Sequence, residues 1–107
     1  MNSNDAIEQL YATIMARKDA SAESSYVASL YTKGVPHIAK KIGEEATETA
    51  MAAALNNNEQ TIYESADLVF HLCVLWAKMG ITPTQIWAEL ASRAGVSGIE
   101  EKQNRKS

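Results

Sequence analysis

The sequence predicts an all-α domain, a four-helix bundle-like fold. Three observations favour it: apolar residues recur at helical spacing, residues that start or stop helices stand at the ends of these stretches, and short polar segments separate them. No segment alternates apolar and polar residues as a half-buried strand does. The 107 residues suit a single domain with a modest core.

Local signals set the expected ends of the helices. Pro36 suits a first helical turn, and Gly80 suits a helix end. Thr82 with Gln85 three residues later resembles a capping box. Ser25 is a candidate to cap a short helix within residues 20–34, and the sequence pattern predicts nothing more about that segment. The four long helices are expected over residues 5–17, 36–55, 59–79 and 83–95.

Composition narrows the class of protein. The net charge of −3 gives no basic surface for nucleic acid, so no nucleic-acid partner is expected. The apolar stretch 68–77 is too short to cross a membrane, and the N-terminus lacks the layout of a signal peptide. One cysteine, Cys73, allows no disulfide within the chain. We therefore expect a cytoplasmic protein. The expected helices form a helical domain over residues 1–95, which a polar tail follows over 96–107.

The helix over 36–55 carries an acid at the edge of its apolar face. Glu45 projects from that edge, and Glu48, Lys41 and Glu44 lie progressively further round the helix. A carboxylate that points toward a core needs a partner, because its burial alone costs several kcal/mol. Glu44 by itself fits a solvated face. The predicted apolar arc consists of Val35, Ile38, Ala39, Ile42, Ala46 and Ala53.

The helix over 59–79 is apolar nearly all round, with one narrow polar stripe. A helix of this kind belongs in an interior. Because a short chain has few elements to cover it, we expect a second subunit to help. The stripe consists of Glu64, Asp67, His71 and Lys78.

Each of these two helices thus offers a pair of acids three residues apart: Glu45 with Glu48, and Glu64 with Asp67. If the helices are antiparallel neighbours, the four acids converge, and they repel one another unless a cation lies among them. Carboxylate oxygens favour Mg²⁺, Mn²⁺ or Ca²⁺ over Zn²⁺. Mg²⁺ held in this way usually serves phosphate chemistry. The sequence predicts a divalent-metal site.

These residues also carry a resemblance. Residues 43–48, Gly-Glu-Glu-Ala-Thr-Glu, followed by 64–67, Glu-Ser-Ala-Asp, resemble the signature of the all-α nucleotide pyrophosphohydrolases. On a wider view nearly the whole chain resembles the phosphoribosyl-ATP pyrophosphatases. The segments that carry this narrower resemblance are Ser25-Tyr26-Val27, Lys33-Gly34, residues 38–45, residues 63–68 with His71-Leu72, and residues 97–102.

The resemblance implies an Mg²⁺-dependent enzyme of histidine biosynthesis. Its small-molecule substrate, phosphoribosyl-ATP, would be cleaved to phosphoribosyl-AMP and pyrophosphate by a homodimer. The expected metal ligands are Glu45, Glu48, Glu64 and Asp67. Glu44 is the candidate to accept the proton of the attacking water, or to hold another ion.

Three residues are candidates for binding the substrate. Lys41 and Lys33 would bind phosphate, and the alternative for Lys41 is an ion pair with a neighbouring glutamate. His71 would orient a ligand or a substrate hydroxyl, and its alternative is a satisfied interior histidine. Residues 97–102 would fold over the substrate, or form a loose tail.

Three rival functions remain open. The first is a housekeeping pyrophosphohydrolase that acts on dUTP or damaged nucleotides. The second is a di-iron bundle, which the pattern disfavours because such proteins pair Glu with His rather than with a second acid. The third is a non-catalytic helical dimerisation module.

Overall fold

The computed structural model describes residues 3–94, which form five α-helices and no strand. The all-α prediction is confirmed, and the short helix that begins after Ser25 is the fifth element. The helices are α1 (Ser3–Arg17), α2 (Tyr26–Lys33), α3 (Val35–Ala54), α4 (Asn58–Met79) and α5 (Pro83–Ser92).

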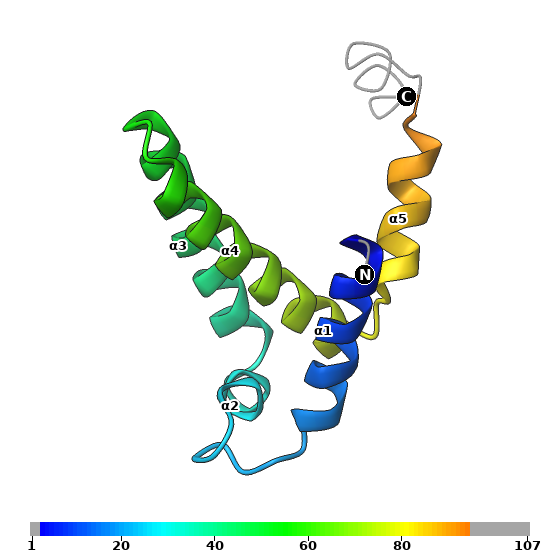
Figure 1. Cartoon of the computed structure of the whole chain (residues 1–107). Coiled ribbons are helices and arrows are strands. Elements are labelled where there is room, and N and C mark those ends of the chain that lie inside the picture. The colour runs from blue at the N-terminus through cyan, green and yellow to red at the C-terminus, as the bar shows by residue number, and fades with distance from the viewer. Residues whose placement is uncertain (1–2, 95–107) are drawn as a thin grey trace.

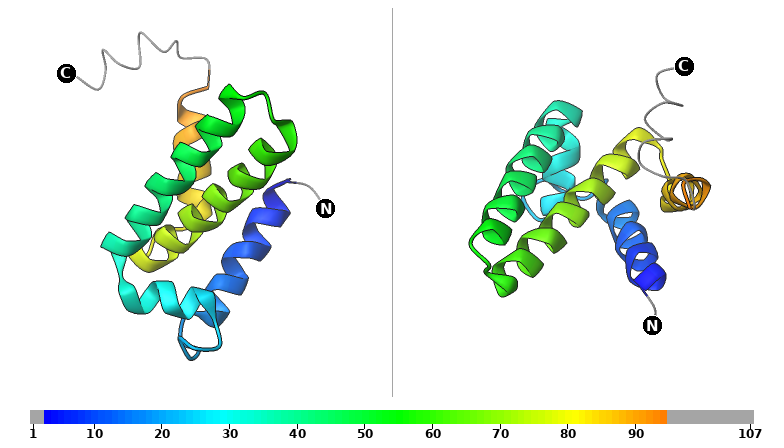
Figure 2. Two further views of the ribbon diagram at one scale, coloured as in Figure 1. Left: turned by 90° about the vertical axis from the view of Figure 1, so that its left-hand side faces the viewer. Right: turned by 90° about the horizontal axis from the view of Figure 1, so that it is seen from above.

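The two longest helices, α3 and α4, form an antiparallel hairpin (Figures 1 and 2). Asn56 turns the chain with a positive φ of 55°, a conformation that Asn tolerates better than most residues. Asn57 then caps α4, because its side-chain oxygen accepts the N–H of Gln60 at 3.1 Å. This tight turn keeps the facing sides of α3 and α4 in contact and sets the register of their side chains.

The core lies where α1 and α2 meet the hairpin. Its buried members come from four helices: Ile14, Val27, Leu30, Ile38, Cys73, Val74 and Ala77. Cys73 is a free thiol with no exposed surface, as expected for a cysteine in an apolar run. The N–H of Ala28 donates to the hydroxyl of Ser25 at 3.3 Å, which caps α2 where it joins this core.

Helix α5 lies beside α1 and away from the α3–α4 hairpin (Figure 1). The predicted capping box is present, with the N–H of Gln85 donating to Thr82 Oγ1 at 3.4 Å. Trp76 and Trp87 contact edge to face across the α4–α5 junction, with 6.4 Å between ring centroids. The helix ends at Ser92, so the expected end at Gly95 is wrong; the backbone N–H of Arg93 already bonds within the last turn.

The predicted apolar face of α3 is also corrected. Of its six residues only Ile38 is buried, while Val35, Ala39, Ala46 and Ala53 are exposed in the single chain. The buried positions are Ile38, Glu45 and Ala52, spaced seven residues apart, because this line of α3 faces α4. Glu45 therefore lies in the middle of the helix–helix contact, not at the edge of an apolar arc.

Helix α4 is less enclosed than its composition predicts. Glu64, His71, Cys73, Val74 and Ala77 are buried, but Ile62 is 71% exposed and Tyr63 is 64% exposed. Among the described residues no single helix is long and apolar enough to cross a membrane, and only α4 and α5 taken together, at a bend of 108°, reach that length and composition. The predicted tail, residues 96–107, lies outside the described residues, and so does Gly95.

Candidate metal centre

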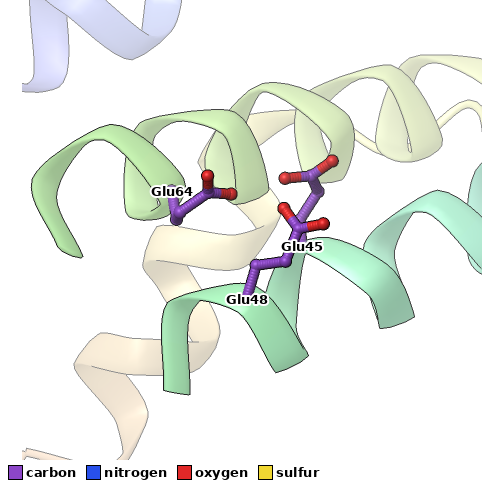
Figure 3. Close-up of side chains that lie close together, drawn as sticks. All are labelled: Glu45, Glu48 and Glu64. Carbon is purple, nitrogen blue, oxygen red and sulfur yellow. The ribbon is translucent and has the colours of Figure 1, made fainter. Parts of the chain in front are cut away.

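Three glutamates meet between the hairpin helices. Glu45 and Glu48 come from α3, one turn apart, and Glu64 comes from α4 (Figure 3). One carboxylate oxygen from each lies within 4.8 Å of the other two. The antiparallel pairing of α3 with α4 thus brings together acids from the two predicted pairs, which are 16 residues or more apart in the sequence.

Two of these carboxylates are buried without enough partners. Glu45 is 5% exposed and Glu64 is 7% exposed. Glu64 Oε1 accepts the side-chain amide of Gln60 at 2.8 Å, and Glu45 Oε1 lies 3.9 Å from the ammonium of Lys41. The Oε2 atoms of both residues are buried and find no hydrogen-bond partner among residues 3–94. Such orphaned oxygens are costly unless something else satisfies them.

The electrostatics of the cluster follow from this crowding. Burial, with the nearby Glu64, Asp67 and Glu48 acting in the same direction, raises the pKa of the Glu45 carboxyl group to about 7. Contact with Glu64 is also the main reason why the pKa of Glu48 is raised. The cluster therefore binds a proton, or a cation in its place, more readily than separate carboxylates do.

Asp67 borders this triad and is half-buried on α4. Its charge acts on Glu45, although its carboxylate is not among the three oxygens that lie within 4.8 Å of one another. Its backbone carbonyl accepts a hydrogen bond from His71 Nδ1 at 2.8 Å. The structure thus brings three of the four predicted ligands together and leaves the fourth beside them.

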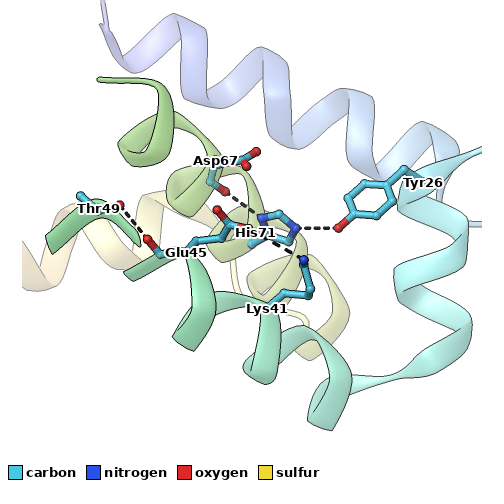
Figure 4. Close-up of polar contacts among 6 residues, drawn as sticks. All are labelled: Tyr26, Lys41, Glu45, Thr49, Asp67 and His71. Atoms are coloured by element: carbon cyan, nitrogen blue, oxygen red, sulfur yellow. Dashed lines mark hydrogen bonds and ion pairs between the residues drawn. The ribbon is translucent and has the colours of Figure 1, made fainter. Parts of the chain in front are cut away.

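Of the other predicted site residues on α2 and α3, only Lys41 contacts a glutamate of the cluster in an ion pair. Lys41 is half-buried and points to Glu45, which is the ion pair that the sequence left as one of two alternatives (Figure 4). Glu44 is exposed on α3 and lies outside the triad. Lys33 is exposed at the end of α2 and makes no ion pair with any residue of the described range.

His71 is 2% exposed and both of its ring nitrogens are engaged. Nδ1 meets the Asp67 carbonyl, and Nε2 lies 2.9 Å from the hydroxyl of Tyr26 on α2 (Figure 4). Sequence reasoning assigned no role to Tyr26. The segment Ser25-Tyr26-Val27 drew attention only as part of the resemblance, because nothing in the spacing of α2 predicts a contact with α4.

An open recess adjoins the acid cluster at the turn end of the hairpin. Its volume is about 430 Å³, which lies within the usual range of small-ligand sites. Glu48 and Glu64 form the acidic side of the recess, and the other lining residues are Met51, Ala52, Leu55, Asn57 and Gln60. A ligand in the recess would contact both carboxylates and an apolar wall.

The donor set fits a hard divalent cation. All the candidate ligand atoms are carboxylate oxygens, which Mg²⁺ prefers, and sulfur or imidazole ligands are absent from the described cluster. The fit is supported by the two buried Oε2 atoms of Glu45 and Glu64, which find no partner in the described part of the chain.

By fold and site the chain is an all-α protein whose central hairpin carries an acidic cluster suited to a divalent cation. Residues 7–94 match the model of the family described as phosphoribosyl-ATP pyrophosphohydrolase, and the chain belongs to that family. The match covers α1 from Ile7 onward and all the later helices.

Curated relatives are similar in sequence to this chain over nearly its full length. The chain is 50% identical to the phosphoribosyl-ATP pyrophosphatase of Azospirillum brasilense, with 94% of this chain and 91% of the relative covered. It is 52% identical to that of Hydrogenovibrio crunogenus, covering 96% and 95%, and 50% identical to that of Trichlorobacter lovleyi, covering 99% of each.

Proposed function

We propose that the chain hydrolyses phosphoribosyl-ATP to phosphoribosyl-AMP and pyrophosphate, the second step of histidine biosynthesis. Water attacks the α-phosphorus, the bond from that phosphorus to the oxygen bridging the β-phosphate breaks, and pyrophosphate leaves. The observation that carries the proposal is the cluster of Glu45, Glu48 and Glu64, in which two buried oxygens have no hydrogen-bond partner within residues 3–94. The name shared by the relatives supports the choice of substrate.

Four carboxylates would hold Mg²⁺ in this scheme: Glu45, Glu48, Glu64 and Asp67. When bound, the ion supplies charge neutralisation for the triphosphate and a coordination site that orients water. Glu45 would bind in its ionised form, and the buried Oε2 atoms of Glu45 and Glu64, which have no hydrogen-bond partner within residues 3–94, would serve as ligands. Asp67 would complete the set from the α4 side.

The remaining polar residues would act on the substrate itself. Glu44 is exposed beside the pair on α3, where its carboxylate would accept the proton of the attacking water. Lys41 would hold a phosphate oxygen of the substrate in place of its 3.9 Å contact with Glu45. Lys33 is a second phosphate-binding candidate.

We also propose that the protein works as a homodimer in the cytoplasm. Four large apolar side chains in the last turns of α3 and the first turns of α4 are exposed in the single chain: Met51, Leu55, Ile62 and Tyr63. A second copy that packs against the hairpin would cover some of this apolar surface. The helical catalytic domain would extend over residues 1–95, followed by the tail.

The test is an assay for pyrophosphate release from phosphoribosyl-ATP, with Mg²⁺ and with a chelator. Ordinary nucleoside triphosphates, dUTP among them, serve as competing substrates. Rapid release from phosphoribosyl-ATP that stops on chelation supports the proposal. Equal rates on dUTP would favour the housekeeping hydrolase, and no hydrolysis of any nucleotide would favour the dimerisation module.

A further inference from the structure

The protons of the His71–Tyr26 pair can be assigned from the chemistry of their partners. The Asp67 carbonyl can only accept, so the Nδ1 atom 2.8 Å away must carry the hydrogen. In a neutral imidazole Nε2 is then an acceptor, and the Tyr26 hydroxyl 2.9 Å away must donate to it. The hydroxyl hydrogen of Tyr26 is therefore already used within the protein.

Tyr26 is held on two sides but remains open to solvent. Its ring stacks on Phe70 at a centroid distance of 6.0 Å and meets His71 edge-on at 5.8 Å. The residue is nevertheless 52% exposed. His71 thus fixes the direction of the hydroxyl, and the remaining lone pairs of the phenol oxygen are free to meet a ligand.

The phenol oxygen lies in the electrostatic field of the metal centre. Burial raises the pKa of Tyr26, so its proton stays in place at neutral pH, and the charges of Lys41, Asp67, Glu45 and Glu44 also act on it. In Figure 4 Tyr26 and Lys41 both lie around His71, and Lys41 reaches toward Glu45. A group bound between Tyr26 and Lys41 would lie beside both the phenol and the Lys41–Glu45 pair.

Resting on the function proposed above, we propose that Tyr26 is a substrate-binding residue whose oxygen accepts a hydrogen bond from an O–H donor in the loaded site, and that His71 is its positioning residue. The donor is a ribose hydroxyl of the nucleotide or a bound water. An ionised phosphate is excluded as the partner of this oxygen, because phosphate oxygens accept hydrogen bonds and Tyr26 has no hydrogen left to give.

The first test measures the assigned proton directly and needs no activity. The chain has two histidines, so ¹⁵N spectra of the ring nitrogens of His71 can be assigned with a His37→Gln variant. The proposal requires a hydrogen on Nδ1 and none on Nε2. A hydrogen on Nε2, alone or in an imidazolium, would free the Tyr26 proton for donation and overturn the proposal.

The second test uses binding of a non-hydrolysable α,β-methylene analogue of phosphoribosyl-ATP, together with KM and kcat. Tyr26→Phe is expected to weaken binding roughly tenfold, as the loss of one hydrogen bond does, with kcat nearly unchanged. Tyr31→Phe is the matched control. It removes a hydroxyl from the same helix, and that hydroxyl has no hydrogen-bond partner within residues 3–94.

Variants of His71 separate positioning from packing. His71→Gln offers an amide oxygen to the Tyr26 hydroxyl and should keep most of the affinity, whereas His71→Leu should match Tyr26→Phe. Because His71 acts through Tyr26, adding His71→Gln or His71→Leu to Tyr26→Phe should weaken binding no further. Additive losses, or unchanged binding in Tyr26→Phe, would overturn the proposal. If His71→Leu does not fold, the comparison of Tyr26→Phe with the double variant Tyr26→Phe, His71→Gln is the test.

Deoxy analogues identify the donor. If it is a ribose hydroxyl, the analogue that lacks it binds equally to the wild type and to Tyr26→Phe. If it is a bound water, every analogue loses affinity by the same factor in the variant. Failure of the wild type to hydrolyse phosphoribosyl-ATP at all would count against the proposed function, while the ¹⁵N result would still test the assigned proton.

Discussion

A carboxylate oxygen of Glu45 on α3 lies within 4.8 Å of one from Glu64 on α4, and in each residue Oε2 is buried without a partner in the described part of the chain. Two acids in such contact repel when both are charged. When Glu45 and Glu64 are both ionised, the contact between α3 and α4 is therefore repulsive, and a bound cation would relieve that repulsion.

Glu64→Gln should lower kcat for phosphoribosyl-ATP by about 100-fold or more while the helices remain, because the amide keeps the shape of the ligand and loses its charge. Pyrophosphate release and circular dichroism measure the two quantities. Asp67→Asn should behave in the same way. Glu59→Gln is the control, since it removes an exposed carboxylate from the first turn of the same helix. Activity like that of the wild type in Glu64→Gln would remove this residue from the metal site.

Without divalent cations, the protein should be less stable at pH 8 than at pH 5. The pKa of Glu45 is about 7 in the folded chain and about 4.3 in the unfolded chain. The raised pKa means that Glu45 binds its proton more tightly in the folded state than in the unfolded state. This protonation therefore stabilises the fold below pH 4, and the stabilisation is lost as the pH rises through 7. The loss is on the order of 1–3 kcal/mol.

Urea unfolding in a chelator at both pH values measures this difference. The groups that face Glu45 are Lys41 and Glu48 on α3, Glu64 and Asp67 on α4, and Tyr26 on α2. Glu45→Gln should flatten the pH dependence, and Glu44→Gln, an exposed neighbour, should leave it in place. A wild-type curve that rises toward pH 8 would contradict the assignment.

Mg²⁺ should bind more tightly as the pH rises through 7 and should release protons when it binds below that pH. The cation binds the ionised form of Glu45, so it competes with the proton that burial favours. Calorimetric titration in two buffers of different ionisation enthalpy gives the number of protons released. The account is wrong on this point if the affinity is independent of pH between 6 and 8.

Lys41→Gln should raise KM roughly tenfold, equivalent to about 1.4 kcal/mol, if the ammonium binds a phosphate of the substrate. If Lys41 serves only the ion pair with Glu45, the substitution should change stability and metal affinity and leave KM unaltered at saturating Mg²⁺. Lys40→Gln is the matched control, because Lys40 is an exposed neighbour on the same helix.

Ile62→Asp should convert the proposed dimer to monomers, because it puts a charge in place of one of the exposed apolar group Met51, Leu55, Ile62 and Tyr63 that a second copy would cover. Sedimentation equilibrium measures the mass of both proteins. Leu90→Asp, on α5, removes a similarly exposed apolar residue far along the chain from that group and should leave the dimer intact. A wild type that is monomeric at micromolar concentration would refute the dimer.

The long helices and the acid pairs could be predicted because the signals are local. Thr82 and Gln85 cap α5 as their spacing indicates, and Glu45 and Glu48 lie one turn apart on any helix. Predicting that Glu45 meets Glu64 required one further assumption, that the two helices form an antiparallel hairpin. In the structure the turn at Asn56 and the helix cap at Asn57 produce this hairpin.

What could not be predicted depends on which side of a helix faces which neighbour. Alanine is compatible with both buried and exposed positions, so the Ala-rich arc of α3 misled the assignment of its buried face. Tyr26 was missed for a related reason. Its contact with His71 joins residues 45 positions apart, and it depends on how the short helix α2 packs against α4. No spacing within either helix encodes that packing.

The most direct test of the central claim is a crystal structure with Mn²⁺ in place of Mg²⁺, in which anomalous scattering locates the ion. The account predicts a peak between α3 and α4, in direct coordination with carboxylate oxygens of Glu45, Glu48 and Glu64. A bound ion elsewhere, with these three carboxylates still unliganded at pH 8, would contradict it.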